Sequence, residues 1–282
     1  MGSLDGRVAF ITGVARGQGR SHALKLAEAG ADIVGLDVCE DATSPRYSLA
    51  TEDDLDETGR LIEKLGRRAV LRKADVRNLE QVSAVVAEGV AELGRLDVVV
   101  ANAGICSIGS TAELTEEAFL EVIDINLSGV WRTVKASVPH LQAGGRGGSI
   151  ILTSSVASVI PPPNIAHYSA AKAGVNSLMA SFALEFGPEL IRVNSVLPTN
   201  VDTPMIDNEF VRKLFMPHQE DPTREDAASA DSAYVQLHAM PVPWVESDDI
   251  SEAVLFLASD ASRYITGVPF PVDAGYHIKK AH

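Results

Sequence analysis

The segment from Arg7 to Ala29 constrains the fold of this chain more than any other segment. Arg7–Thr12 is an apolar run typical of a buried strand, and apolar residues recur at helical spacing before Ala29. The turn between them contains Gly13, Arg16, Gly17, Gln18 and Gly19. Glycines let the backbone approach an anion, and a helix N-terminus offers free N–H groups and a favourable dipole. The order therefore predicts a pyrophosphate-binding turn, although G-x-x-x-G-x-G by itself also occurs in purely structural turns.

The next strand, Asp32–Asp37, ends in a carboxylate. At this point of a nucleotide-binding fold, a carboxylate accepts hydrogen bonds from the ribose diol of adenosine and repels a 2′-phosphate. Asp37 therefore favours NAD over NADP as the cofactor. The alternative is a helix cap or a solvated strand end.

Apolar strand-like runs continue to alternate with helical patterns along the chain. The further strands are expected at 69–71, 97–101, 150–153, 191–197 and 268–273. This alternation predicts a single α/β domain with a doubly wound, seven-stranded parallel sheet and helices on both faces. The 282 residues and 46% hydrophobic content suffice for one such domain with a substantial core.

Polar and small residues follow the ends of these strands. They are Asp75, Val76, Asn102, Ala103, Gly104, Ser155 and Pro198. Because ligands of parallel sheets lie beyond the carboxyl ends of the strands, we expect these residues to surround one site.

The stretch Ser149–Gly174 predicts the chemistry of that site. A helix after the proline-rich loop 161–163 carries Tyr168 and Lys172 four positions apart, on one face. A phenol titrates near pH ~10, and a neighbouring ammonium favours the phenolate, so we expect Lys172 to lower the pKa of Tyr168 and make it an acid or base. Ser155 would hold the oxygen that Tyr168 protonates or deprotonates. The alternative is an ordinary surface pair of tyrosine and lysine.

Two segments are longer than connections in such a fold require. Residues 38–52 lie at the adenosine end and predict either an inserted flap or a disordered surface loop. Residues 205–243 lack clean periodicity and predict a substrate lid. Asn126 lies within a long helix expected from Thr115 toward Pro139, where asparagine is a poor helix former. It is either a buried residue with a local hydrogen bond or a residue that opens the helix to hold a water molecule.

Charge and composition exclude several classes of partner. The net charge of −14 would repel nucleic acids and anionic membranes. The chain has no apolar run of membrane-spanning length and no signal-peptide pattern at its start. Its two cysteines, Cys39 and Cys106, stand far apart, so we expect reduced thiols and a cytoplasmic protein. The seven histidines lack metal-ligand spacing, which predicts no metal.

Taken in order, these motifs closely resemble the short-chain dehydrogenase/reductase family. The resemblance covers nearly the whole chain through Thr12-Gly13-x-x-x-Gly17-x-Gly19, Asn102-Ala103-Gly104, Asn126, Ser155 and Tyr168-x-x-x-Lys172. It implies hydride exchange between nicotinamide and an alcohol or carbonyl. Tyr168 would be the acid/base, Ser155 would orient the substrate oxygen, and Lys172 would also hold the nicotinamide ribose. Asn126 would position a relay water, Asp75 and Val76 would border adenine, and Val201 and Thr203 would hold the carboxamide. The family also implies a homotetramer.

Two departures narrow the resemblance. The family usually has Pro-Gly after the sixth strand, whereas this chain has Pro198-Thr199, and the segment after Asp37 is lengthened. Both features resemble the mycofactocin-dependent subgroup often labelled carveol dehydrogenases, in which bound NAD is re-oxidised by an external carrier. The residues expected to line a mostly apolar substrate pocket are Ser155, Val156, Ile165, His167, Met205, Phe210, Leu214, Phe215 and Trp244.

The substrate predicted on this basis is a hydrophobic secondary alcohol of the terpenoid or carveol kind. Two alternatives stay open. One is an ordinary enzyme of the family that exchanges NAD freely and acts on another alcohol, a 3-oxoacyl compound or a steroid. The other is a non-catalytic NAD-binding sensor on the same fold.

Overall fold

Seven parallel strands form one sheet in the order β3-β2-β1-β4-β5-β6-β7 in the computed structural model, which describes residues 2–279. The strands are β1 (Val8–Thr12), β2 (Asp32–Asp37), β3 (Ala69–Lys73), β4 (Val98–Ala101), β5 (Gly148–Thr153), β6 (Ile191–Pro198) and β7 (Pro269–Val272). The chain winds outward from β1 to β3 and then returns to the other side of β1 with β4. The predicted doubly wound α/β fold is therefore confirmed.

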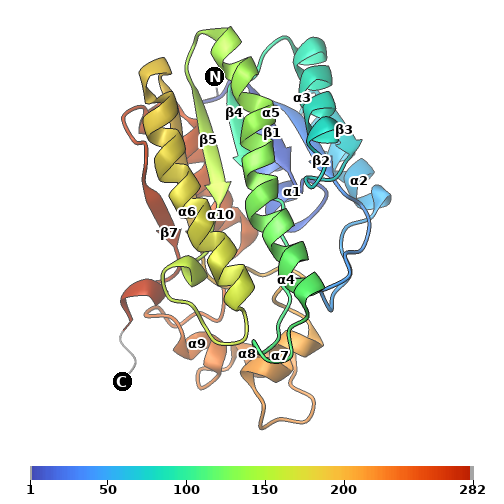
Figure 1. Ribbon diagram of the computed structural model, residues 1–282, viewed down its shortest axis with the longest axis vertical. Coiled ribbons are helices and arrows are strands. Elements are labelled where there is room, and N and C mark those ends of the chain that lie inside the picture. The colour runs from blue at the N-terminus through green and yellow to red at the C-terminus, as the bar shows by residue number, and fades with distance from the viewer. Residues whose placement is uncertain (1, 280–282) are drawn as a thin grey trace.

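Helices cover both faces of the sheet (Figure 1). One face carries α1 (Gly17–Glu28), α2 (Glu52–Lys64) and α10 (Ser247–Ala258), and the other carries α3 (Leu79–Leu93), α4 (Glu116–Ile123), α5 (Gly129–Gly144) and α6 (Ala166–Phe186). Side chains of β1 alternate between the two cores, since Val8 and Phe10 belong to one and Ala9 and Ile11 to the other. Burial on both faces explains why the strands read as continuous apolar runs.

The long helix expected from Thr115 toward Pro139 differs from the prediction in two ways. A π-helical turn, η1 (Asp124–Ser128), joins α4 to α5, and α5 continues past Pro139 to Gly144. Proline removes the donor to the carbonyl four residues earlier. That carbonyl belongs to Lys135, an exposed residue, so water can replace the lost donor.

The segment 205–243 contains three short helices that lie beyond the carboxyl ends of the strands, at the bottom of Figure 1 in orange. They are α7 (Glu209–Phe215), α8 (Arg224–Ala228) and α9 (Ala233–Gln236). They surround a small core of their own, in which the rings of Phe215 and Tyr234 stack with centroids 4.5 Å apart. The remaining short helices are η2 (Val156–Ser158), η3 (Gly187–Glu189), η4 (Asp260–Ser262) and η5 (Tyr276–Ile278).

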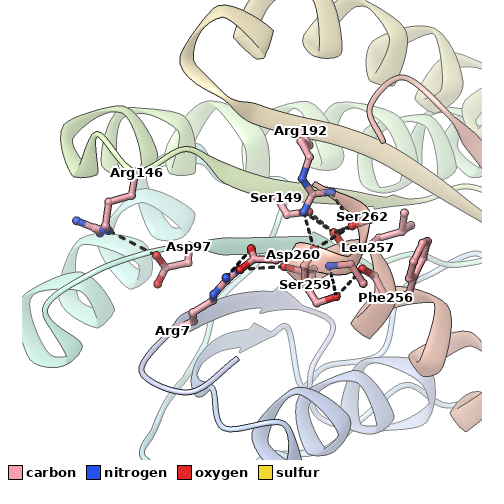
Figure 2. A network of polar contacts seen from close by, with 12 residues as sticks. Arg7, Asp97, Arg146, Ser149, Arg192, Phe256, Leu257, Ser259, Asp260 and Ser262 are labelled. Carbon is pink, nitrogen blue, oxygen red and sulfur yellow. Dashed lines mark hydrogen bonds and ion pairs between the residues drawn. The ribbon is translucent and has the colours of Figure 1, made fainter. Parts of the chain in front are cut away.

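A polar network fixes the opposite, amino end of the sheet (Figure 2). Arg192 of β6 donates to the carbonyl oxygen of Leu257 at 2.8 Å and to the Ser262 hydroxyl at 2.9 Å. Arg7 pairs with Asp260 at 2.6 Å. These contacts join β6 and the chain before β1 to the end of α10. The amino end is thus tied together independently of the carboxyl end.

Candidate functional site

Two adjoining cavities lie at the carboxyl ends of the strands. The glycine-turn cavity, of about 190 Å³, is lined by the turn after β1 and by residues after β2, β3 and β4. The tyrosine cavity, of about 230 Å³, is lined by Ser155, Tyr168 and Lys172, by residues after β6 and by residues of segment 205–243, which is called the lid segment after its expected role. Residues shared by both linings are Gln18, Tyr47, Asn102, Gly104, Thr203 and Met205. The cavities therefore meet where the strand order reverses between β1 and β4, the usual ligand position of such sheets.

The turn after β1 has the form of an anion cradle. A Cβ atom on Gly19 would lie 1.8 Å from the carbonyl oxygen of Gly13, so only glycine fits there. Gly17 adopts φ +53° at the start of α1, and the N-cap residue Arg16 makes no side-chain capping bond. The N–H groups of the first helical turn are consequently left for a ligand. The Gln18 side-chain oxygen is also buried without a partner in the described residues.

Asp37 occupies the wall of the glycine-turn cavity at the end of β2. Its carboxylate accepts hydrogen bonds from the backbone N–H groups of Ala15 at 3.0 Å and Cys39 at 3.3 Å. Burial raises the pKa of Asp37 above its ordinary value, although these hydrogen bonds oppose the shift. The fixed carboxylate suits a ribose diol. Asp75 and Val76 line the same cavity.

The turn after β4 is held against the turn after β1. The backbone N–H groups of Asn102 and Ala103 donate to the Thr12 hydroxyl at 3.0 and 3.1 Å, and the Asn102 amide donates to the Thr12 carbonyl at 3.0 Å. Gly104 then passes close to the helix residues, since a Cβ there would lie 3.5 Å from Lys172 Nζ. Asn102, Ala103 and Gly104 all line the glycine-turn cavity, as the strand-end pattern indicated.

Tyr168 and Lys172 enter the tyrosine cavity from the first turns of α6. Lys172 is only 3% exposed, and its Nζ donates to the Thr153 carbonyl at 2.7 Å. The same nitrogen lies 5.6 Å from the centroid of the Tyr168 ring. Ser155, just after β5, accepts a hydrogen bond from the Ala157 N–H at 3.1 Å. The structure thus brings Ser155, Tyr168 and Lys172 to one cavity, while Asn126, the fourth residue of the predicted catalytic set, is not in its lining.

The pKa of Tyr168 is shifted in the direction opposite to the expectation. Burial raises it above the ordinary value of a phenol, and a hydrogen bond with Ser155 opposes the shift. Lys172 does not lower it, because burial disfavours the ammonium as well and lowers the pKa of Lys172 to about 8. Desolvation of both groups outweighs their mutual attraction in the protein alone.

Asn126 lies in the π-helical turn η1 and is fully buried. Its side-chain oxygen accepts from the Ile105 N–H at 2.9 Å, and its side-chain nitrogen donates to the Ile105 carbonyl at 2.7 Å. The side chain thus satisfies a backbone that is distant in sequence, rather than making the expected local hydrogen bond. The water-holding role stays a prediction.

Most of the residues expected around the substrate line the tyrosine cavity. They are Ser155, Val156, Ile165, Met205, Phe210, Leu214 and Phe215, with Pro198 and Val201 from the end of β6. Trp244 does not, which corrects the prediction. Its ring packs edge-on against Tyr234, with centroids 6.2 Å apart, under the Arg224 guanidinium. His167 also points elsewhere, with Nε2 2.8 Å from the Ser107 hydroxyl. Neither residue belongs to the cavity lining.

The segment 38–52, called the insertion below, contributes side chains to both cavities that the sequence patterns do not predict. Tyr47 lines both, and its phenol oxygen accepts from the Cys106 N–H at 3.0 Å. The Arg46 guanidinium lies 4.5 Å over the ring of Phe210 in the lid segment. The aromatic residue in an otherwise polar stretch was the available signal, but nothing in the sequence gives the direction in which an irregular segment folds.

Glu121 of α4 anchors the middle of the insertion. Its carboxylate accepts from the Thr43 N–H at 3.1 Å, from the Thr43 hydroxyl at 2.8 Å and from the Ser44 N–H at 2.8 Å. Closer to the glycine turn, Arg16 donates to the Ser48 carbonyl. The insertion is therefore attached at several points around the cavities.

Two features are absent from the described part of the chain. Between residues 2 and 279 no helix has both the length and the apolar composition needed to cross a membrane. Over the same range, no cluster of three or more histidine, cysteine, aspartate or glutamate side chains is arranged to hold a metal ion.

Comparison with known proteins relates the whole chain to one group. Residues 13–277 match the family model described as enoyl-(acyl carrier protein) reductase. The (-)-trans-carveol dehydrogenase of Rhodococcus erythropolis is 52% identical, over 99% of this chain and 100% of that protein. A putative short-chain type dehydrogenase/reductase of Mycolicibacterium smegmatis is 54% identical over 99% of each chain. The crystal structure of carveol dehydrogenase from Mycobacterium avium in complex with NAD superposes with a TM-score of 0.97 at 51% identity, covering 99% of this chain and 100% of that one.

Proposed function

Because the chain belongs to the short-chain dehydrogenase/reductase family, we propose that it interconverts a hydrophobic secondary alcohol, of the terpenoid or carveol kind, and its ketone. The family resemblance seen in the motifs is confirmed, and the protein is an oxidoreductase that uses NAD.

The observation that carries the proposal is the position of Tyr168 and Ser155 beside the glycine-turn cavity. The residues of that cavity fit a dinucleotide: the glycine turn leaves helix N–H groups free for a pyrophosphate, and the fixed Asp37 carboxylate suits the ribose diol of NAD. The lid side of the tyrosine cavity is largely apolar, with Ile206, Phe210 and Leu214, which suits a hydrophobic alcohol.

In this mechanism Tyr168 takes the proton of the substrate hydroxyl during oxidation and returns it during reduction. Bound NAD supplies the hydride acceptor, and its cationic oxidised ring favours a nearby phenolate. Ser155 holds the substrate oxygen against the phenol and opposes the effect of burial on the pKa of Tyr168, and Lys172 is held at the Thr153 carbonyl, beside the Tyr168 ring. A positioned general base contributes roughly 10²–10⁴ in rate.

We further propose that the insertion retains the cofactor, which an external carrier of the mycofactocin kind re-oxidises. Three contacts support retention: Glu121 with Thr43 and Ser44, Tyr47 with the Cys106 N–H, and Arg46 with Phe210. The last contact joins the insertion to the lid segment, so a bound dinucleotide would leave only after these segments separate. A homotetramer in the cytoplasm stays a prediction of the sequence.

The function is tested with the Tyr168→Phe variant. Removing the phenol hydroxyl should lower kcat for secondary alcohols at least about a hundredfold while the variant still binds NAD, since the ring itself remains. Turnover is followed with an artificial electron acceptor, and NAD is measured after denaturation of the purified protein. Wild-type rates in the variant would refute the assignment of Tyr168. A wild-type protein that binds NAD but oxidises no secondary alcohol would favour the sensor instead.

A further inference from the structure

Thr199 and Asn200 form a polar corner of the tyrosine cavity that the proposed reaction does not use. Both residues line the cavity directly after β6 ends at Pro198. What this corner binds depends on which of its atoms carry protons.

His238 determines the direction of the Thr199 hydroxyl. The ring nitrogen Nδ1 of His238 lies 2.7 Å from the Val242 carbonyl oxygen, which can only accept, so Nδ1 carries a proton. The ring is only 1% exposed, and burial lowers the pKa of His238, so the imidazole is neutral at pH 7 and Nε2 has a lone pair. Nε2 lies 2.7 Å from the Thr199 hydroxyl oxygen. The Thr199 hydroxyl therefore donates to His238.

His238 itself lies behind the cavity rather than in its lining. Its position is fixed from the side by the ring of Tyr276, whose centroid is 6.2 Å away, and by Lys279, which donates to the His238 carbonyl at 2.6 Å. The lid segment and the C-terminal segment thus hold the imidazole against Thr199 from two sides.

With its proton committed to His238, the Thr199 oxygen is left with lone pairs, and no other hydrogen bond to it occurs within residues 2–279. The next residue, Asn200, lines the same cavity, and its side-chain nitrogen is buried and has no partner in the same range. The corner therefore offers one acceptor and one unpaired donor, and a hydroxyl group, which both donates and accepts, is their complement.

We propose that the substrate carries a second hydroxyl group, distinct from the one that Tyr168 acts on, which Thr199 and Asn200 bind. The inference rests on the proposed oxidation of a secondary alcohol and narrows it to diols and hydroxy-ketones. A monohydric alcohol would leave the Asn200 N–H and the Thr199 lone pairs unpaired in the complex, which costs about tenfold or more in kcat/KM.

The test compares cyclohexanol with the 1,2-, 1,3- and 1,4-cyclohexanediols, using the full chain and an artificial electron acceptor. Wild type should show a kcat/KM for at least one diol that exceeds that for cyclohexanol by about tenfold, beyond the statistical factor of two reactive hydroxyls. Thr199→Val, which keeps the shape of the side chain, should reduce the ratio of the two kcat/KM values, diol over cyclohexanol, to about the statistical factor. Thr199→Ser, which keeps the hydroxyl, should preserve it.

Two results would overturn the inference: no diol is preferred by wild type, or Thr199→Val slows cyclohexanol and the diols equally. If Thr199→Val slows all the alcohols equally and also binds NAD more weakly, the Thr199 hydroxyl contacts the cofactor rather than the substrate. If no alcohol is turned over by wild type, the proposed reaction fails separately. Calorimetric binding of diol and cyclohexanol to the Tyr168→Phe variant then still decides the inference, which is wrong if both bind equally.

Discussion

At the scale of single residues, burial decides the chemistry of the tyrosine–lysine pair. The sequence spacing places Tyr168 and Lys172 on one helix face, but the pKa of each depends on how completely the fold removes it from water. Burial raises the pKa of Tyr168 and lowers that of Lys172 to about 8. The buried ammonium of Lys172 therefore lowers the free energy of unfolding, by an amount that depends on pH.

The Lys172→Met variant tests this cost. The pKa of Lys172 is about 8 in the folded protein against an ordinary 10.5, so between these values the unfolded chain binds more protons than the folded one. Stability then rises with pH. The free energy of unfolding of wild type, minus that of the variant, should increase by on the order of 1–2 kcal/mol from pH 7 to pH 9.5. Chemical denaturation at the two values measures it, and a constant difference would contradict the burial argument.

At the scale of elements, α4 and the insertion act together although they are far apart in sequence. A single α4 side chain, Glu121, accepts three hydrogen bonds from Thr43 and Ser44 and is nearly buried beneath them. Charged hydrogen bonds of this kind are among the stronger ones in proteins. The attachment of the insertion therefore depends on this one carboxylate more than on any regular secondary structure.

If the insertion retains NAD as proposed, the Glu121→Ala variant should lose more bound NAD during gel filtration than wild type, because the middle of the insertion is released from α4. The NAD content before and after filtration, measured on denatured protein, reports the loss. Glu117→Ala, an exposed acid on the same helix, is the matched control and should retain cofactor like wild type. If both variants retain NAD equally, Glu121 has no part in cofactor retention.

At the scale of the whole molecule, the two ends of the sheet have different tasks. The carboxyl end carries the cavities, while the amino end is tied by the network around Arg192, Arg7 and Asp260 (Figure 2). Arg192 is largely buried and reaches several acceptors at once, which a planar guanidinium does better than a lysine. Stability and catalysis should thus be separable by mutation.

Arg192→Lys should lower the free energy of unfolding by about 2–4 kcal/mol, since the single ammonium nitrogen cannot occupy the positions of two guanidinium nitrogens. One of these donates to the Ser262 hydroxyl and the other to the Leu257 and Ser259 carbonyls. The KM for alcohol should not change, because β6 meets the cavity at its other end. Arg146→Lys, in the same network but 3.7 Å from Asp97 and half exposed, should cost less than about 0.5 kcal/mol. Denaturant unfolding and steady-state rates check both variants. A changed KM would show that the amino end of the sheet influences the cavities at the carboxyl end.

The strands, the glycine turn and the residues after the strand ends could be predicted from the sequence. Apolar runs such as 97–101 need burial on both faces, and parallel strands bring the residues after them, such as Asn102 and Ser155, to one edge of the sheet. The helix expected toward Pro139 extends further than predicted, because a proline is tolerated where water replaces the lost donor. Local pattern therefore determined the architecture and the edge that carries the site.

How distant segments meet depends on the packing of the whole chain. Trp244 faces Tyr234 rather than the cavity, Tyr47 reaches both cavities, and His238 fixes the proton of Thr199. The direction in which the pKa of Tyr168 is shifted depends on this packing as well. The physical reason is that irregular segments carry no periodicity that orients their side chains, and desolvation depends on everything packed around a group rather than on its neighbours in sequence.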